Sequence, residues 1–211
     1  MPTRFSRRSL LRSGALLTGA AVAGCASAPG TDPLFAEGFE ESDERWTRHG
    51  HIGPEESQDA FEWDISLSEE RAAAGEWSLA VFTEGDHDDG VAWVTAELPT
   101  PEDPSTFSVS FRAWSESESF NVLRNAVAYL GPEEPTEEGD FPDPGANSSA
   151  VPDAPYGGLR EPLHLAEGWR EYAFDWDPDE APERLFLSVG VAVVWEADAT
   201  HYVDDIEVTA E

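Results

Sequence analysis

The stretch "VAWVTAEL", Val91 to Leu98, places Ala92, Val94, Ala96 and Leu98 at alternate positions. Because successive side chains of a β-strand point to opposite faces, this set lies on one face, and Trp93, Thr95 and Glu97 lie on the other. The stretch "FSVSFRAW", Phe107 to Trp114, repeats the pattern with apolar residues at its odd-numbered positions. Both stretches therefore predict strands that bury one face in a core.

Similar strand-like runs recur along the rest of the chain. They are Trp77–Phe82, Val122–Leu130, Tyr172–Trp176, Leu185–Trp195 and His201–Val208. Helix-length amphipathic segments are absent from the sequence pattern. Many short strands separated by Pro and Gly turns predict an all-β fold, an antiparallel β-sandwich of the jelly-roll type, as one domain over residues 34–211.

One segment, Gly131 to Pro162, interrupts this rhythm. It holds 7 of the 16 prolines, 8 acidic residues and few large apolar side chains. We expect a long Pro/Gly-rich loop insertion rather than a strand pair, and loops of this length are either functional or disordered. Asn147 begins an Asn-Ser-Ser glycosylation sequon within it.

The charge balance is strongly acidic. All 12 basic residues are arginines, and the part after Cys25 sets eight of them against 44 acidic residues. At about 1 M salt the screening length falls to roughly 3 Å, so repulsion among these charges is largely removed. The composition therefore indicates a halophilic protein, and it disfavours nucleic acid as a partner.

The N-terminus carries an export pattern. Ser6–Leu11, "SRRSLL", resembles a twin-arginine signal, and the apolar run from Gly14 to Gly24 is shorter than the roughly 20 residues that a bilayer span needs. The ending Val-Ala-Gly-Cys resembles a lipobox, in which Cys25 receives a lipid. We expect a signal peptide over 1–25, a tether over 26–33 and a lipid-anchored protein on the outer face of the cytoplasmic membrane. The alternative is an ordinary leader with an incidental cysteine.

Three motifs resemble, in order, landmarks of carbohydrate-binding-module-like jelly rolls of the galactose-binding superfamily. Leu34–Glu40 followed by Trp46 is similar to the opening strand, Arg71–Val81 to the entry into the second strand, and Tyr202–Val208 to the closing strand. The resemblance covers nearly all of the chain after Cys25 and implies a non-catalytic module that binds glycan. The segment 131–162 departs from the family pattern.

The resemblance also implies a structural Ca²⁺ held by Asp204, Glu40 and carbonyls near Gly75, all hard oxygen donors. Alternation in the last strand puts Asp204 on one face with Tyr202, Ile206 and Val208, and so points it inward. A buried carboxylate needs a cation, an arginine or several hydrogen bonds. The alternative to calcium is that Asp204 caps backbone amides or pairs with Arg71.

Two tryptophans are expected on polar strand faces. Trp93 and Trp114 should point outward, and with Arg112, Asn125 and Tyr129 they form a candidate glycan platform. Small residues at Ser188, Gly190 and Ala192 can leave that face concave. The alternative is that the proline-rich segment folds over the rings and makes them a second core.

The sequence after Cys25 contains no further Cys and no Met, which excludes disulfides, iron–sulfur clusters and thiolate chemistry there. It shows no nucleophile elbow, phosphate loop or zinc-protease helix, so we expect no enzyme. The favoured function is a lipid-anchored, extracellular binding module for glycan or cell-envelope polysaccharide. The alternative is a structural or protein-interaction domain of the cell surface with no small ligand.

Overall fold

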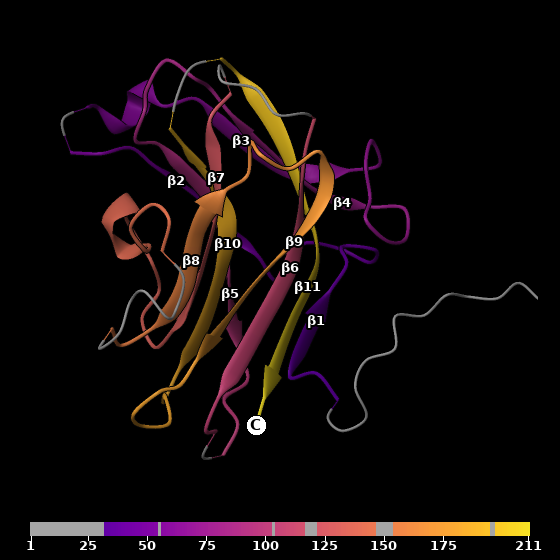
Figure 1. Cartoon of the computed structure of the whole chain (residues 1–211), viewed down its shortest axis with the longest axis vertical. Helices are drawn as coiled ribbons and strands as arrows, with labels where there is room; N and C mark the ends of the chain where they lie inside the picture. The colour runs from indigo at the N-terminus through magenta and orange to yellow at the C-terminus, as the bar shows by residue number, and fades with distance from the viewer. Residues whose placement is uncertain (1–31, 55, 103, 117–121, 147–153, 195–196) are drawn as a thin grey trace, which may run out of the picture. The chain divides into compact units, whose positions relative to one another are not determined.

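The computed structural model describes residues 32–54, 56–102, 104–116, 122–146, 154–194 and 197–211, except the side chain of Asp59. These residues form two antiparallel sheets, which face each other in Figure 1. The predicted all-β sandwich is therefore confirmed. Among the described residues, no helix has the length and apolar character needed to cross a membrane.

Sheet A has five strands in the spatial order β3, β4, β11, β6, β9, and its sixth strand, β1, pairs with the second half of β11. Their bounds are β1 Phe35–Glu37, β3 Trp63–Ser68, β4 Ser78–Thr83, β6 Phe107–Ser115, β9 Gly168–Trp176 and β11 Ala199–Ala210.

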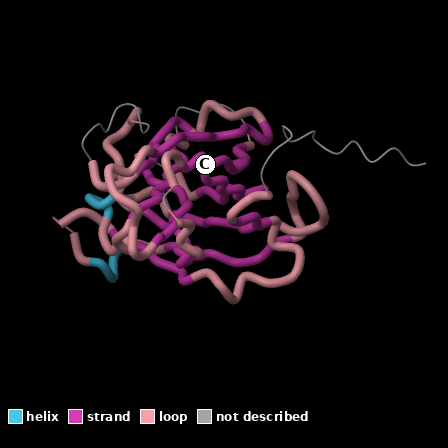
Figure 2. The backbone as a smooth tube through the Cα atoms, turned by 90° about the horizontal axis from the view of Figure 1, so that it is seen from below, coloured by secondary structure: helices cyan, strands magenta, loops and turns pink. Residues whose placement is uncertain are grey.

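Sheet B has the order β2, β5, β10, β7, β8. Its strands are β2 Thr47–His51, β5 Val91–Leu98, β7 Arg124–Gly131, β8 Gly157–Pro162 and β10 Leu185–Val193. Two short 3₁₀ turns, Gln58–Ala60 and Glu138–Asp140, are the helical segments in Figure 2.

The core lies between the sheets and contains the predicted apolar sets. The odd-numbered residues of β6 from Phe107 to Ala113 and the even-numbered residues of β5 from Ala92 to Leu98 are all buried in it. Each large side chain that is fully buried contributes about 1.5–3 kcal/mol. The period-two pattern therefore predicted the inner faces of these strands correctly.

β11 breaks the alternation that the sequence suggested. Its register against β6 shifts between Asp204 and Glu207, and Asp205 has a φ of 49°. Val203, Ile206 and Val208 consequently lie in the core, whereas Tyr202 pairs with Trp114 on the opposite face. The prediction that Tyr202, Asp204, Ile206 and Val208 share a face is wrong, because a bulge inserts residues on one strand.

The segment 131–162 is not a loop throughout. Its last part is β8, which pairs with β7 from Leu130↔Gly157 to Asn125↔Pro162. Gly157 and Gly158 lie where a Cβ would meet Trp176 and the carbonyl of Ala128. The strand therefore depends on close packing rather than on strand propensity, which explains why the sequence pattern missed it.

Gly190 of β10 provides a test of this packing. A Cβ at this position would lie 2.2 Å from the carbonyl oxygen of Ala92 and 2.6 Å from Cα of Trp93. We expect Gly190→Ala to lower the free energy of unfolding by about 1–3 kcal/mol, because the neighbouring backbone must move.

Chemical denaturation of the wild type and of Gly190→Ala in molar salt measures this change in the free energy of unfolding. Gly139→Ala is the matched control, because nothing lies within 4 Å of its Cβ position. Equal stability of the Gly190 and Gly139 variants would contradict the packing described for β5 and β10.

Candidate functional site

The predicted platform residues divide between the outer faces of the two sheets. Trp93, Asn125 and Tyr129 belong to sheet B, whereas Arg112 and Trp114 belong to sheet A. A single platform is therefore a wrong prediction. β5 and β6 follow each other in the chain but pair into different sheets, which alternation within each strand cannot reveal.

The outer face of sheet B is covered. The Trp93 ring is 1% exposed, with His49 stacked on it at 5.1 Å and the edge of Phe141 at 5.2 Å. Tyr129 is also buried and packs against Tyr156 at 4.8 Å. On this face the proline-rich segment packs over the rings and forms a second core, which was the alternative expectation from the sequence.

Polar contacts hold this cover in place. Arg160 of β8 is buried and pairs with Glu138. Nδ1 of His51 accepts the backbone N–H of Glu138 at 3.3 Å, and Nε2 of His49 lies 3.5 Å from a Glu134 carboxylate oxygen. Asn125 is buried as well. Trp93, Asn125 and Tyr129 are consequently closed to a ligand in this conformation.

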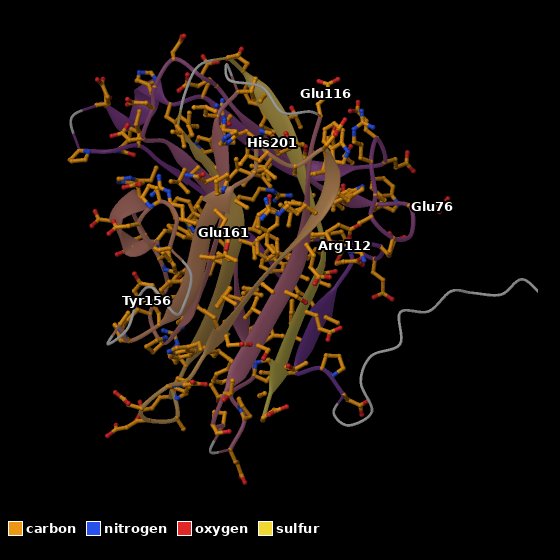
Figure 3. The ribbon with its side chains drawn as sticks, viewed as in Figure 1. Glu76, Arg112, Glu116, Tyr156, Glu161 and His201 are labelled. Atoms are coloured by element: carbon orange, nitrogen blue, oxygen red, sulfur yellow. The ribbon has the colours of Figure 1, made fainter. Side chains whose placement is uncertain are left out.

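The outer face of sheet A is covered in part by the loop that begins at Arg71, and pockets remain beside this loop among the described residues. A pocket of about 400 Å³, here called the Trp114 pocket, lies at the ends of β6 and β11. The residues that line it include Arg71, Trp114, Glu116, Asp198, Thr200 and Tyr202. Figure 3 shows Glu116 at the upper end of β6, with Tyr156 of the covered face on the other side of the sandwich.

Two aromatic rings and an arginine shape this pocket. The rings of Trp114 and Tyr202 meet edge to face at 5.6 Å, and the Arg71 guanidinium carbon lies 4.0 Å from the Trp114 ring centroid. The Tyr202 hydroxyl donates to Glu70 at 2.7 Å. Burial, together with this hydrogen bond, raises the pKa of Tyr202 to about 12, so its proton stays in place at neutral pH.

Trp114 is the one predicted platform residue that lines this pocket. Arg112, two residues earlier on β6, pairs instead with Asp205 at 3.5 Å. The sequence pattern indicates no ligand role for Arg71 or Tyr202. Only the long-range pairing of β11 with β6 brings them to Trp114.

The loop that carries Arg71 is anchored by two carboxylates. Asp204, which is fully buried, accepts the backbone N–H groups of Ala73 and Ala74 at 2.7 and 3.2 Å and that of Asp205 at 2.7 Å. Burial raises the pKa of Asp204, and these amides oppose that effect.

Glu40 completes the anchor. One of its carboxylate oxygens accepts the N–H groups of Glu76 and Trp77, both at 2.9 Å. A Cβ at Gly75, whose φ is +64°, would lie 2.1 Å from the same carboxylate. Glycine is therefore required at Gly75 both by its backbone conformation and by the space available.

These contacts bear on the calcium prediction. Asp204, Glu40 and Gly75 do lie together, but the carboxylates face N–H donors of the loop. Within the described ranges, no three or more His, Cys, Asp or Glu residues cluster closely enough to hold a metal ion. The arrangement fits the amide-capping alternative, and calcium stays a prediction of the resemblance. Cys25 and Asn147 lie outside the described residues.

No family model matches the chain, and no curated protein matches it. Solved structures share its fold. One, from work on the promiscuous specificity of carbohydrate-binding modules of the beta-sandwich superfamily, has a TM-score of 0.54 at 19% identity, over 82% of this chain and 60% of that chain.

Two further structures are covered almost completely. TmCBM61 in complex with beta-1,4-galactotriose has a TM-score of 0.52 at 14% identity, over 86% of this chain and 100% of that one. The CBM22-1 xylan-binding domain from Paenibacillus barcinonensis Xyn10C has a TM-score of 0.51 at 14% identity, over 87% of this chain and 97% of that one. At these identities the likeness shows a common β-sandwich fold.

The role of Asp204 can be tested by truncation. Asp204→Ala leaves three backbone N–H groups without their acceptor, and each buried unpaired group costs about 1–3 kcal/mol. We expect the free energy of unfolding to fall by about 3 kcal/mol or more, whereas Glu41→Ala, which removes an exposed acid, leaves it nearly unchanged.

Thermal melts with Ca²⁺ and with a chelator complete this test. An unchanged stability of Asp204→Ala would contradict the anchoring role. A Ca²⁺-dependent rise in Tm that is lost in Asp204→Ala would support the calcium prediction.

His201 predicts a pH dependence. It is 2% exposed, and burial lowers its pKa to about 4, below the ordinary value of 6.5. Because the folded protein favours the neutral imidazole, its contribution is fully present above pH 6.5 and is lost as the pH falls towards 4. This shift corresponds to about 3 kcal/mol of stability.

Denaturation of the wild type and of His201→Phe between pH 6.5 and pH 4 isolates the contribution of His201 to stability. The two proteins share every other titrating group. We expect the wild type to lose more stability than the variant on acidification. Parallel pH profiles would contradict the buried neutral state of His201.

Proposed function

We propose that this protein is a non-catalytic carbohydrate-binding module that binds glycan at the Trp114 pocket. The observation that carries the proposal is a pocket in which the half-buried Trp114, with Arg71 over its ring, lies near Glu116 and Asp198. An aromatic surface fits the apolar face of a sugar ring, and surrounding charged groups can exchange hydrogen bonds with its hydroxyls. The fold shared with a xylan-binding domain and a galactotriose complex supports this reading.

The proposal includes a place of action. The twin-arginine pattern, the lipobox at Cys25 and the acidic composition support a lipid-anchored protein on the outer face of the cytoplasmic membrane in a salt-rich environment. Among the described residues, at least six of the eight arginines after Cys25 form ion pairs with carboxylates, which leaves most of the 44 acids to be screened by salt. Its ligand is then a polysaccharide of the envelope or its surroundings.

Trp114→Ala tests the binding function. Loss of a ring that stacks on sugar should weaken glycan affinity at least about tenfold, which corresponds to roughly 1.4 kcal/mol. Titration of the domain with neutral polysaccharides, followed by tryptophan fluorescence in molar salt, measures the change.

Trp93→Phe is the matched control, because Trp93 belongs to the covered face and should not affect binding. Assays for new reducing ends should stay at background, as expected of a binding module. A wild-type protein that binds none of the polysaccharides would contradict the proposal and favour a cell-surface interaction domain.

A further inference from the structure

A row of side chains runs across the outer face of sheet A, perpendicular to its strands. Trp169 of β9 pairs with Trp114 of β6, and Trp114 pairs with Tyr202 of β11. The row continues through Ala80 of β4 to Ser66 of β3. Paired residues of neighbouring strands share a face, so these five residues, here called the cross-strand row, form one line.

The two halves of the cross-strand row differ in size. Three aromatic residues occupy one half, and the small Ala80 and Ser66 occupy the other. A second pocket, of about 240 Å³, lies over the small half and shares Tyr202 and Thr200 with the Trp114 pocket. The two pockets thus adjoin at Tyr202 and Thr200 and make a groove that crosses several strands.

The dimensions of the groove indicate the length of its ligand. Neighbouring strands lie about 4.8 Å apart, and the two pockets reach from Trp114 of β6 to Ser66 of β3, which is three spacings or about 14 Å. A single sugar unit occupies only part of this length. A chain of several units is needed to contact both pockets at once.

The direction of the groove follows from the contacts that block it on the side of Arg112. Further along β6 on the same face, Arg112 is paired with Asp205. The adjacent Asp204 is covered by the loop that begins at Arg71, and it accepts N–H groups of that loop. The open path therefore runs across the strands, with Arg71 and Glu70 forming one wall.

The charge of the groove indicates the chemistry of its ligand. Exposed carboxylates of Asp64, Glu70, Glu116 and Asp198 line the two pockets, against the single cation of Arg71. Carboxylates accept hydrogen bonds from sugar hydroxyls but repel uronate and sulfate groups. At contact distance this repulsion persists in molar salt, where the screening length is still about 3 Å.

From these observations we infer that the ligand is an extended, uncharged polysaccharide that lies along the cross-strand row, across β9, β6, β11, β4 and β3. The inference rests on the proposed function and adds the charge class, the length and the direction of the ligand. The half-buried Trp114 provides the aromatic contact in the first pocket, and the half-buried Trp169, its neighbour on β9, extends that aromatic surface beyond the pocket, whereas Tyr202 is buried beneath the groove. The depression over Ala80 and Ser66 takes the next sugar units.

Titration calorimetry with neutral xylo-, gluco- and galacto-oligosaccharides, from di- to hexasaccharide, tests the inference, with polygalacturonate as the charged probe. We expect affinity for the best-bound series to rise at least about tenfold with length, and polygalacturonate not to bind. Trp169→Ala should weaken binding of the hexasaccharide.

Ala80→Gln should remove the gain in affinity with length by filling the second pocket. Ala173→Gln, on the same outer face but outside the groove, is the matched control and should behave as wild type. Melting temperatures verify that each variant folds.

The possible failures are distinguishable. Affinity that does not rise with length, with disaccharides still bound through Trp114, overturns the extended groove but leaves the proposed function standing. Equal or tighter binding of polygalacturonate overturns the charge class. Absence of binding to every carbohydrate overturns both proposals.

Discussion

The carboxylate of Asp204 holds together the part of the molecule on which the candidate site depends. One edge of β11 is shared by β4, which pairs with its first half, and by β1, which pairs with its second half. The bulge lies where these partners change, and there Asp204 accepts three backbone N–H groups. Before the bulge, Tyr202 lies on the outer face beside Trp114, and the anchored loop carries Arg71 onto the Trp114 ring.

The two outer faces illustrate different uses of aromatic side chains. On sheet B, Phe141 and Tyr156 come from the segment that follows β7 and pack on Trp93 and Tyr129, so the rings stabilise the fold. On sheet A, two adjoining pockets extend from Trp114 to Ser66, and Arg71 lies over the Trp114 ring. The proposed binding surface is therefore the face on which the described residues form pockets.

Strand alternation predicted the fold class and the inner faces of β5 and β6, because burial imposes a strict period of two. Strand alternation did not predict the features that depend on long-range contacts. These are the assignment of the consecutive strands β5 and β6 to different sheets, the bulge at Asp204, and the strand that contains Gly157 and Gly158. The candidate site was predicted only through Trp114. Arg71 and Tyr202 join it through a loop anchor and a strand pairing, which local sequence patterns do not encode.

Amide hydrogen exchange, with and without a saturating neutral oligosaccharide, tests the location of the site most directly. We expect slowed exchange in three segments that surround the groove, at 70–77, 114–116 and 198–202, with little change in β5 and β7. Protection confined to β5, β7 and residues 131–146 would place the ligand on sheet B beneath its cover, and it would contradict the assignment of the outer face of sheet A as the binding surface.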